Sequence, residues 1–245
     1  MANIRLLLAY EGTHYLGWQK TRMGPSIEQS LEVALATIFH TQFSLQAASR
    51  TDAGVHAEGQ VVNFFIHTDF DLYKLQRSLL ALLPSDISVL KLEVVKESFH
   101  PTLDAQGKEY HYNVCNDNVQ LPFHRKFSWH FPYPLNLYSM RQAATMLTGE
   151  WDFSAFSNQK VTEGKRKIHS IEILSLPDRR LRFVIRGDNF LYKMVRNLVG
   201  TLLYVGCGKI SLAAIPTILK ERKRSNAGVT APAHGLVLHK VFYID

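Results

Sequence analysis

The chain has 245 residues, 46% of them hydrophobic, so it can bury a sizeable core in one large domain or in two of ordinary size. This composition argues against a disordered chain. Lys and Arg number 28 against 21 Asp and Glu, and the net charge of +7 favours a nucleic acid as partner over an acidic membrane surface.

Cysteine usage and hydropathy bear on the compartment. Cys115 and Cys207 are the only two cysteines, too few for a disulfide framework or a Cys-rich zinc site. The apolar run near the N-terminus is too short for a signal peptide, and no later run reaches the length of about 18 residues that a membrane span needs. We therefore expect a soluble protein of the reducing cytoplasm with no membrane partner.

The first strand and helix are expected between residues 4 and 39. Residues 4–10 have the pattern of a buried strand, and the loop 11–25 that follows mixes aromatic and basic side chains. Aromatic rings and cations together suit RNA, in which bases stack and phosphates pair, although a loop folded over a core edge explains them equally well. Ser26 and Gln29 form a capping box that opens a helix with one apolar face.

Residues 43–48 and 60–66 are expected to be strands, with a connection that contains Asp52. A second helix begins after Asp71 and ends before Pro84, and residues 87–95 form the next strand. The first hundred residues thus follow the order strand, helix, strand, strand, helix, strand, which is the ferredoxin-like pattern.

The second half follows the same order. Strands are expected at 108–116, 168–176, 180–187 and 235–243, and helices at 137–147, after the capping residue Asn136, and at 190–205. Three segments depart from the repeat and are interpreted as insertions: 122–131, the polar loop 151–167, and a helical piece at 211–224 that Pro216 kinks or delays.

The repeat predicts an α+β fold with two ferredoxin-like (RRM-like) halves, residues 1–105 and 106–245. Their antiparallel sheets would join into one large sheet with a central active-site cleft.

Basic side chains gather in the insertions and on one strand, where phosphate contacts are expected although each group alone suits a solvated face. The basic positions in question are Lys165, Arg166 and Lys167, the run 220–224, and Arg180, Arg182 and Arg186. Lys20 and Arg22 in the first loop are further candidates for RNA contacts.

The connection around Asp52 is the leading candidate site. From Arg50 to Gly59 it is longer than the two to five residues of a simple turn, and it holds an arginine, a carboxylate, glycines and His56. A lone Asp-x-Gly would more often be an ordinary turn. The length and the reactive residue types favour a carboxylate that faces a cleft.

Other chemistries lack their motifs. The sequence has no phosphate-binding glycine loop, no dinucleotide fingerprint and no serine nucleophile elbow, and its 11 histidines show no metal-ligand spacing. We expect no cofactor and no metal. The remaining candidate is Asp52 acting as a nucleophile, with Arg50 beside it, Tyr110 on a strand and Arg196 on an apolar helix. A rim tyrosine and a salt-bridged arginine are the ordinary explanations for the last two.

The motifs taken together resemble the tRNA pseudouridine synthase A family. The resemblance covers nearly the whole chain: the run 50–57 followed by 59–64, Tyr10-x-Gly12-x-x-Tyr15-x-Gly17-Trp18-Gln19, Ser26-Ile27-Glu28, Phe99-His100, Lys108-x-Tyr110-x-Tyr112, Asp152-Phe153-x-x-Phe156, and 190–200 from Phe190-Leu191 through Arg196 to Gly200.

The resemblance implies a homodimer that isomerises uridine to pseudouridine in the anticodon stem-loop of tRNA, at tRNA positions 38–40, without metal or cofactor. It assigns Asp52 as the catalytic nucleophile, Arg50 as the arginine beside it, Tyr110 as the active-site tyrosine and Arg196 as the partner of the aspartate. Leu236 matches an apolar wall of the pocket.

Three departures from the family pattern concern RNA contacts rather than the chemistry: Ser49 in place of glycine, Pro101-Thr102 where Ala-Arg is common, and Glu109 where many members have a basic residue. Two other functions remain open at this point. A non-catalytic RRM-like RNA-binding protein would present the same exposed tyrosines. An aspartate-dependent hydrolase would use His56 as its acid or base.

Overall fold

The computed structural model describes residues 1–244, and residue 245, the last of the predicted second half, lies outside them. The chain divides into two compact units, one made of Met1–Gln106 together with the described residues from Leu238 onward, and the other of Gly107–Val237. Both combine helices with mostly antiparallel strands, so the expected mixture of helix and antiparallel sheet is confirmed. The two ferredoxin-like halves and their boundary at residue 105 stay predictions.

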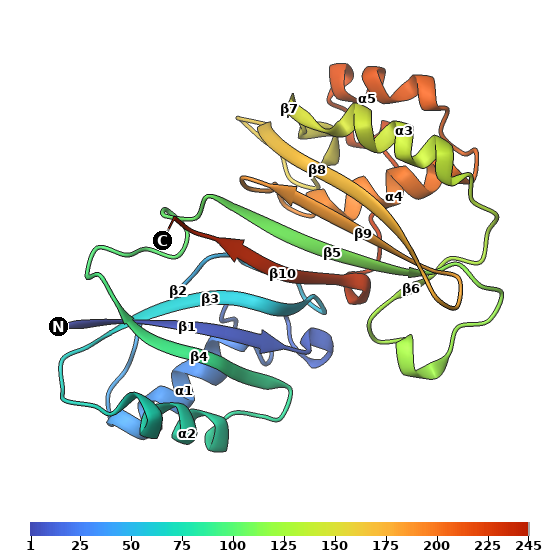
Figure 1. The fold of residues 1–245 in the computed structure, drawn as a ribbon. Coiled ribbons are helices and arrows are strands. Elements are labelled where there is room, and N and C mark those ends of the chain that lie inside the picture. The colour runs from blue at the N-terminus through green and yellow to red at the C-terminus, as the bar shows by residue number, and fades with distance from the viewer. Residues whose placement is uncertain (245) are drawn as a thin grey trace. The chain divides into compact units, whose positions relative to one another are not determined.

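The first unit, which we call unit 1, has strands in the order β4-β1-β3-β10, with β2 paired to β3. The elements are β1 (Ala2–Tyr10), α1 (Ile27–Phe39), β2 (Gln46–Ala47), β3 (His56–Ile66), α2 (Leu72–Leu82), β4 (Ile87–Val95) and β10 (Leu236–Phe242). Both helices lie on one side of β1, β3 and β4 (Figure 1). Most of β10 groups with unit 1, whereas the repeat placed it at the end of the second half.

The helices of unit 1 begin where their capping residues predict. Ser26 Oγ accepts the Gln29 N–H at 3.3 Å, and Asp71 Oδ1 accepts the Lys74 N–H at 3.0 Å. Each cap satisfies one N–H that the first helical turn leaves free, which stabilises a helix by about 1 kcal/mol. The apolar face of α1 is buried at Ile27, Leu31 and Leu35, as its spacing predicts.

The second unit, unit 2, has strands in the order β5-β9-β8-β7, with β6 parallel to β5. Its strands are β5 (Gly107–Cys115), β6 (Trp129–His130), β7 (Gly149–Asp152), β8 (Lys165–Leu176) and β9 (Arg180–Gly187), and its α-helices are α3 (Leu137–Leu147), α4 (Met194–Gly206) and α5 (Ile215–Glu221). Short 3-10 turns at Ser154–Phe156, Arg224–Asn226 and Ala233–Gly235 connect them. Figure 1 shows α3 and α5 beside each other at the β7 and β8 end of this unit.

Several boundaries differ from the sequence expectation. The expected strand 43–48 is reduced to Gln46–Ala47, and α4 starts at Met194, after Lys193 in the left-handed region at φ 60°. The segment expected to be a polar loop at 151–167 contains the end of β7, a 3-10 turn and the start of β8. Pro216 stands in the first turn of α5, where its missing N–H costs no hydrogen bond.

Close backbone contacts fix helix α4 within unit 2. A Cβ on Gly200 would lie 1.8 Å from the Val229 carbonyl oxygen, and one on Gly228 would lie 2.6 Å from Gly200 O. Only glycines let the helix and the segment 228–229 approach this closely. The position of Arg196, one turn earlier on the same helix, follows from this contact.

Among the described residues, no helix is long and apolar enough to cross a membrane.

Candidate active site

The loop that carries Asp52 lies between β2 and β3 and is fixed through its backbone. The Thr51 carbonyl accepts the Trp18 N–H at 3.0 Å, and the Gly54 N–H donates to the Tyr15 carbonyl at 3.3 Å. The Val55 N–H donates to the Asp52 carbonyl at 3.1 Å, which closes a turn with Gly54 at φ +76°. The loop 11–25 therefore holds the Asp52 turn from one side.

Side chains hold the residues on either side of Asp52. The Tyr10 and Thr51 hydroxyls lie 2.8 Å apart, and Gln60 Nε2 donates to the Ser49 carbonyl at 2.6 Å. The Ser49 N–H donates back to Gln60 Oε1 at 3.2 Å. Asp52 itself is half-buried. A partly accessible carboxylate on a fixed backbone is the arrangement that a positioned nucleophile requires.

His56 belongs to the strand rather than to the loop. The sequence predicted that the loop runs to Gly59, but β3 starts at His56, and Ala57 pairs with Tyr10 of β1. His56 is 2% exposed, and its Nδ1 accepts the Gly12 N–H at 3.0 Å. The imidazole thus holds the loop 11–25 in place, which supports a structural role and disfavours the hydrolase.

Arg50, on the other flank of Asp52, is exposed and makes no hydrogen bond or ion pair with any residue from 1 to 244. Its guanidinium is therefore available to a ligand.

Unit 2 carries the other predicted pocket residues. Tyr110 on β5 is 7% exposed, and its ring meets the Phe190 ring edge-on, with centroids 5.2 Å apart at 87°. Arg196 on α4 is half-buried, and its Nε donates to the Ala231 carbonyl at 2.7 Å. The Ala231 N–H in turn donates to the Arg196 carbonyl at 3.2 Å, so the segment after the 228–229 crossing fixes this arginine.

Arg196 lies in a cluster of unit 2 whose members are far apart in the sequence and share no motif. The Tyr112 hydroxyl donates to the Pro232 carbonyl at 2.8 Å, and a Cβ on Gly235 would lie 2.5 Å from the Tyr112 ring. Burial raises the pKa of Tyr112 well above its ordinary value, against the opposing charge of Arg196. Leu236, 6% exposed, follows directly at the start of β10.

His234 was missed because nothing in its local pattern distinguishes it. Burial lowers its pKa, and the Arg196 charge acts in the same direction, while a backbone hydrogen bond with Ser128 opposes them. The imidazole therefore stays neutral to lower pH than a free histidine. Tertiary packing alone reveals this.

The predicted RNA-contacting cations lie in two places. Lys20 and Arg22 line a groove of about 960 Å³ in unit 1, where Lys20 Nζ pairs with Glu32 Oε2 at 2.6 Å. Lys165, Arg166 and Lys167 open β8 in unit 2, and Lys165 pairs with Asp152 of β7 in the sheet register. Because Glu32 partly neutralises Lys20, Lys20 is a weaker candidate for an RNA contact than Arg22.

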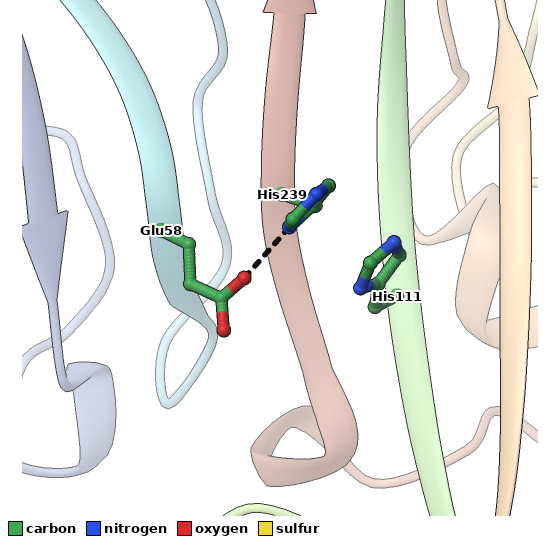
Figure 2. Close-up of side chains that lie close together, drawn as sticks. All are labelled: Glu58, His111 and His239. Atoms are coloured by element: carbon green, nitrogen blue, oxygen red, sulfur yellow. Dashed lines mark hydrogen bonds and ion pairs between the residues drawn. The ribbon is translucent and has the colours of Figure 1, made fainter.

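Histidine and carboxylate pairs also occur on the strands. Figure 2 shows Glu58 of β3 directed at His239 of β10, with Oε2 and Nδ1 2.7 Å apart. His111 Nε2 of β5 lies 2.9 Å from Glu109 Oε1 within unit 2. The expectation that the protein needs no metal and no cofactor stays a prediction.

Comparison with known proteins gives the family. Residues 7–103 and 143–244 match the family described as tRNA pseudouridine synthase. The tRNA pseudouridine synthase A 2 of Protochlamydia amoebophila is 51% identical over 99% of this chain and 95% of its own length. A tRNA pseudouridine synthase A of Thermodesulfovibrio yellowstonii is 38% identical over 99% of this chain and its full length. The chain belongs to the tRNA pseudouridine synthase family.

A solved chain in an H/ACA RNP bound to a substrate RNA containing 2′-deoxyuridine aligns with 82% of this chain at a TM-score of 0.39 and 14% identity. This chain spans 44% of that one.

Proposed function

We propose that this protein isomerises uridines in the anticodon stem-loop of tRNA and that Asp52 is its nucleophile. Membership of the family makes the chain an isomerase that converts uridine to pseudouridine in tRNA. The net charge of +7 agrees with a polyanionic substrate. One observation supports the assignment of Asp52 above all. Its carboxylate is half-buried, and hydrogen bonds of the residues before and after it fix the turn on which it stands.

The proposed reaction balances without a cofactor. Asp52 attacks either C6 of the uracil or C1′ of the ribose, and the bond between C1′ and N1 breaks. The base turns, C5 bonds to C1′, and the bond from Asp52 to C6 or C1′ breaks with return of its electron pair to the carboxylate. The C5 proton is released, and N1 takes up a proton. The product has the composition of the substrate, so no oxidant, reductant or second substrate is consumed.

The remaining residues take supporting roles in this proposal. Tyr110 lies against the flipped uracil and helps to remove the C5 proton, and Leu236 forms an apolar wall. Arg196 is the proposed partner of the Asp52 carboxylate and orients it for attack. Arg50 occupies the space that the flipped base leaves in the RNA stack.

The alternative of a non-catalytic RRM-like protein is not favoured, because relatives that match nearly the whole chain are named as synthases.

The proposal also includes a homodimer in the cytoplasm. Light scattering after size-exclusion chromatography should give twice the 27.9 kDa mass of one chain.

Tritium release from tRNA labelled at C5 of uridine tests the nucleophile. Wild type should release tritium, and Asp52→Asn should release none while it binds tRNA nearly as tightly, because the amide keeps the shape and loses the nucleophile. Asp69→Asn, an exposed carboxylate in the loop before α2, is the matched control and should keep full activity. Tritium release by Asp52→Asn at the wild-type rate would refute the assignment.

A further inference from the structure

A polar pocket of about 510 Å³ in unit 2 brings together basic segments that are far apart in the sequence. Its lining includes residues of the segment 154–162, together with Arg222 at the end of α5 and Arg224 in the next turn. Arg222 Nε lies 3.1 Å from Asp152 Oδ2 on β7, and Asp152 is paired in register with Lys165 of β8. The two basic runs near 165 and 222 therefore meet here.

Arg224 is held as a fixed cation at this pocket. Its guanidinium donates to Asn197 Oδ1 at 2.8 Å, Thr230 Oγ1 at 2.9 Å, the Gly228 carbonyl at 2.7 Å and Asn158 Oδ1 at 3.3 Å. All of these acceptors are neutral, and among residues 1–244 no carboxylate forms an ion pair with Arg224. Burial lowers the pKa of Arg224, because it partly desolvates the charge and no carboxylate partner offsets this cost.

The acceptors of Arg224 are themselves fixed by a buried network. Asn197 on α4 is fully buried, and its Nδ2 donates to the Phe156 carbonyl at 2.6 Å and to Asn158 Oδ1 at 2.7 Å. Thr230 Oγ1 donates to Asn197 Oδ1 at 2.7 Å. The Ala227 carbonyl takes a further N–H of Arg224 at 3.5 Å, so the N–H groups of the guanidinium all point to neutral acceptors. Arg224 therefore contributes a fixed positive charge to the pocket, and the exposed Lys160 and Arg222 supply the direct contacts to an anion.

The only carboxylate in the lining, Asp152, is already engaged. Ser154 donates to it from both N, at 3.0 Å, and Oγ, at 2.5 Å, and Arg222 adds an ion pair. Burial acts to raise the pKa of Asp152, but these partners and Lys165 hold it below its ordinary value. Three cations, Lys160, Arg222 and Arg224, against one carboxylate leave the lining with a charge of +2.

The neutral part of the lining has donors that suit a phosphate. Ser157, Gln159 and Thr162 offer hydroxyl and amide groups beside the cations. Lys160 is exposed and makes no hydrogen bond or ion pair with residues 1–244. Cations with neutral donors around them are the usual partners of RNA phosphates, which position a substrate without reading its bases.

We propose that this pocket binds a phosphodiester of the tRNA backbone, in addition to the residues assigned to the reacting uridine. The inference rests on the proposed function only in naming tRNA as the source of the phosphate. The contact anchors the substrate and does not take part in bond breaking.

Binding to a tRNA transcript whose anticodon-arm uridines are replaced by cytidine tests this subsite without turnover. Lys160→Gln/Arg222→Gln should bind about 3-fold to 10-fold more weakly at low salt, and the slope of log Kobs against log salt should become shallower by about 1 for each lost phosphate contact. Both side chains are exposed, so the fold should be kept, and a melting curve checks this.

The matched control is Lys74→Gln/Arg77→Gln, which removes the same two charges from exposed positions on α2 of unit 1. It should leave the salt slope unchanged. An unchanged slope in Lys160→Gln/Arg222→Gln, or an equal change in the control, overturns the proposal.

The subsite can fail independently of the proposed function. In tritium release the Lys160→Gln/Arg222→Gln variant should show a raised KM and an unchanged kcat. If wild type releases no tritium, the proposed function fails. A shallower slope of log Kobs against log salt in the pocket variant alone would still support the phosphate site.

Discussion

At the scale of single residues, the candidate nucleophile is positioned by its neighbours rather than by its own side chain. Thr51 and Ser49 are tied to Tyr10 and Gln60, so the backbone at Asp52 has little freedom. The side chain of Arg50, between these two residues, is exposed and makes no hydrogen bond or ion pair with the described residues. Residues that hold the backbone therefore alternate with an exposed arginine and the candidate nucleophile within four positions.

Arg50→Ala should separate function from stability. Since the side chain makes no hydrogen bond or ion pair in residues 1–244, the free energy of unfolding should change by no more than about 0.5 kcal/mol. The kcat/KM for tritium release should fall at least about 10-fold, because the proposed role is to hold the flipped state. Arg77→Ala, an exposed arginine on α2, should change neither quantity. Normal kcat/KM in Arg50→Ala would remove Arg50 from the site.

His234 should make folding sensitive to mild acid. Burial lowers its pKa in the folded protein below the ordinary value of 6.5, so below that pH the unfolded chain binds a proton that the folded chain does not. Its contribution is therefore complete above about pH 6.5 and is lost as the pH falls towards the folded-state pKa. Urea unfolding between pH 7.5 and 5 should show a smaller loss for His234→Gln than for wild type.

His14→Gln, at an exposed histidine, is the control for this measurement and should follow the wild-type pH dependence. Identical pH dependence in His234→Gln and wild type would contradict the prediction.

At the scale of elements, glycines set how closely segments approach at the site. A Cβ on Gly12 would lie 2.0 Å from the Val55 carbonyl oxygen, and one on Gly17 would lie 2.5 Å from the Thr51 carbonyl oxygen. Gly17 also has φ +96°, which L side chains rarely adopt. These contacts press the loop 11–25 against the Asp52 turn, so the sequence of the first loop determines the geometry of the second.

Gly17→Ala should therefore impair catalysis more than binding. The added methyl displaces Thr51 and with it Asp52, and a misplacement of this kind lowers kcat by about 10-fold to 100-fold. The tRNA affinity should remain within about 3-fold, because the cations are untouched. Gly24→Ala in the same loop contacts only the tip of the Leu16 side chain and is the control. A wild-type kcat in Gly17→Ala would show that the turn tolerates the shift.

At the scale of the whole molecule, the final residues complete the N-terminal unit. The Tyr243 hydroxyl donates to the Pro101 carbonyl at 2.7 Å, and its ring centroid lies 5.2 Å from that of Phe99. The Gln106 N–H donates to the Phe242 carbonyl at 2.8 Å. Residues that follow unit 2 in the chain are therefore part of unit 1 and contribute to its packing.

Tyr243→Ala should destabilise unit 1 by about 2 kcal/mol, since it removes a ring contact and leaves the Pro101 carbonyl without its donor. Hydrogen exchange of the β1 and β3 amides should accelerate accordingly. Ile244→Ala, at the exposed neighbouring position, should leave exchange unchanged. Equal exchange in both variants would show that these final contacts do not stabilise unit 1.

Local pattern was sufficient for most helices and strands. The apolar face of α1, the caps at Ser26, Asp71 and Asn136, and the limits of β4 follow from periodicity and capping chemistry, which act within a few residues. The family and its tRNA substrate were likewise readable from the motifs along the chain. The catalytic roles stay proposals.

Contacts between residues distant in sequence determined the features that the local pattern could not predict. Strand β3 starts at His56 because Ala57 pairs with Tyr10 and His56 accepts the Gly12 N–H, and neither partner is visible in the residues around Asp52. Arg224 is fixed by Asn197 and Asn158, and most of β10 groups with the unit that begins the chain. By itself the sequence determined most of the elements and the family. Pairing between distant segments, which no local periodicity encodes, determined how Asp52 is held and where the basic runs meet.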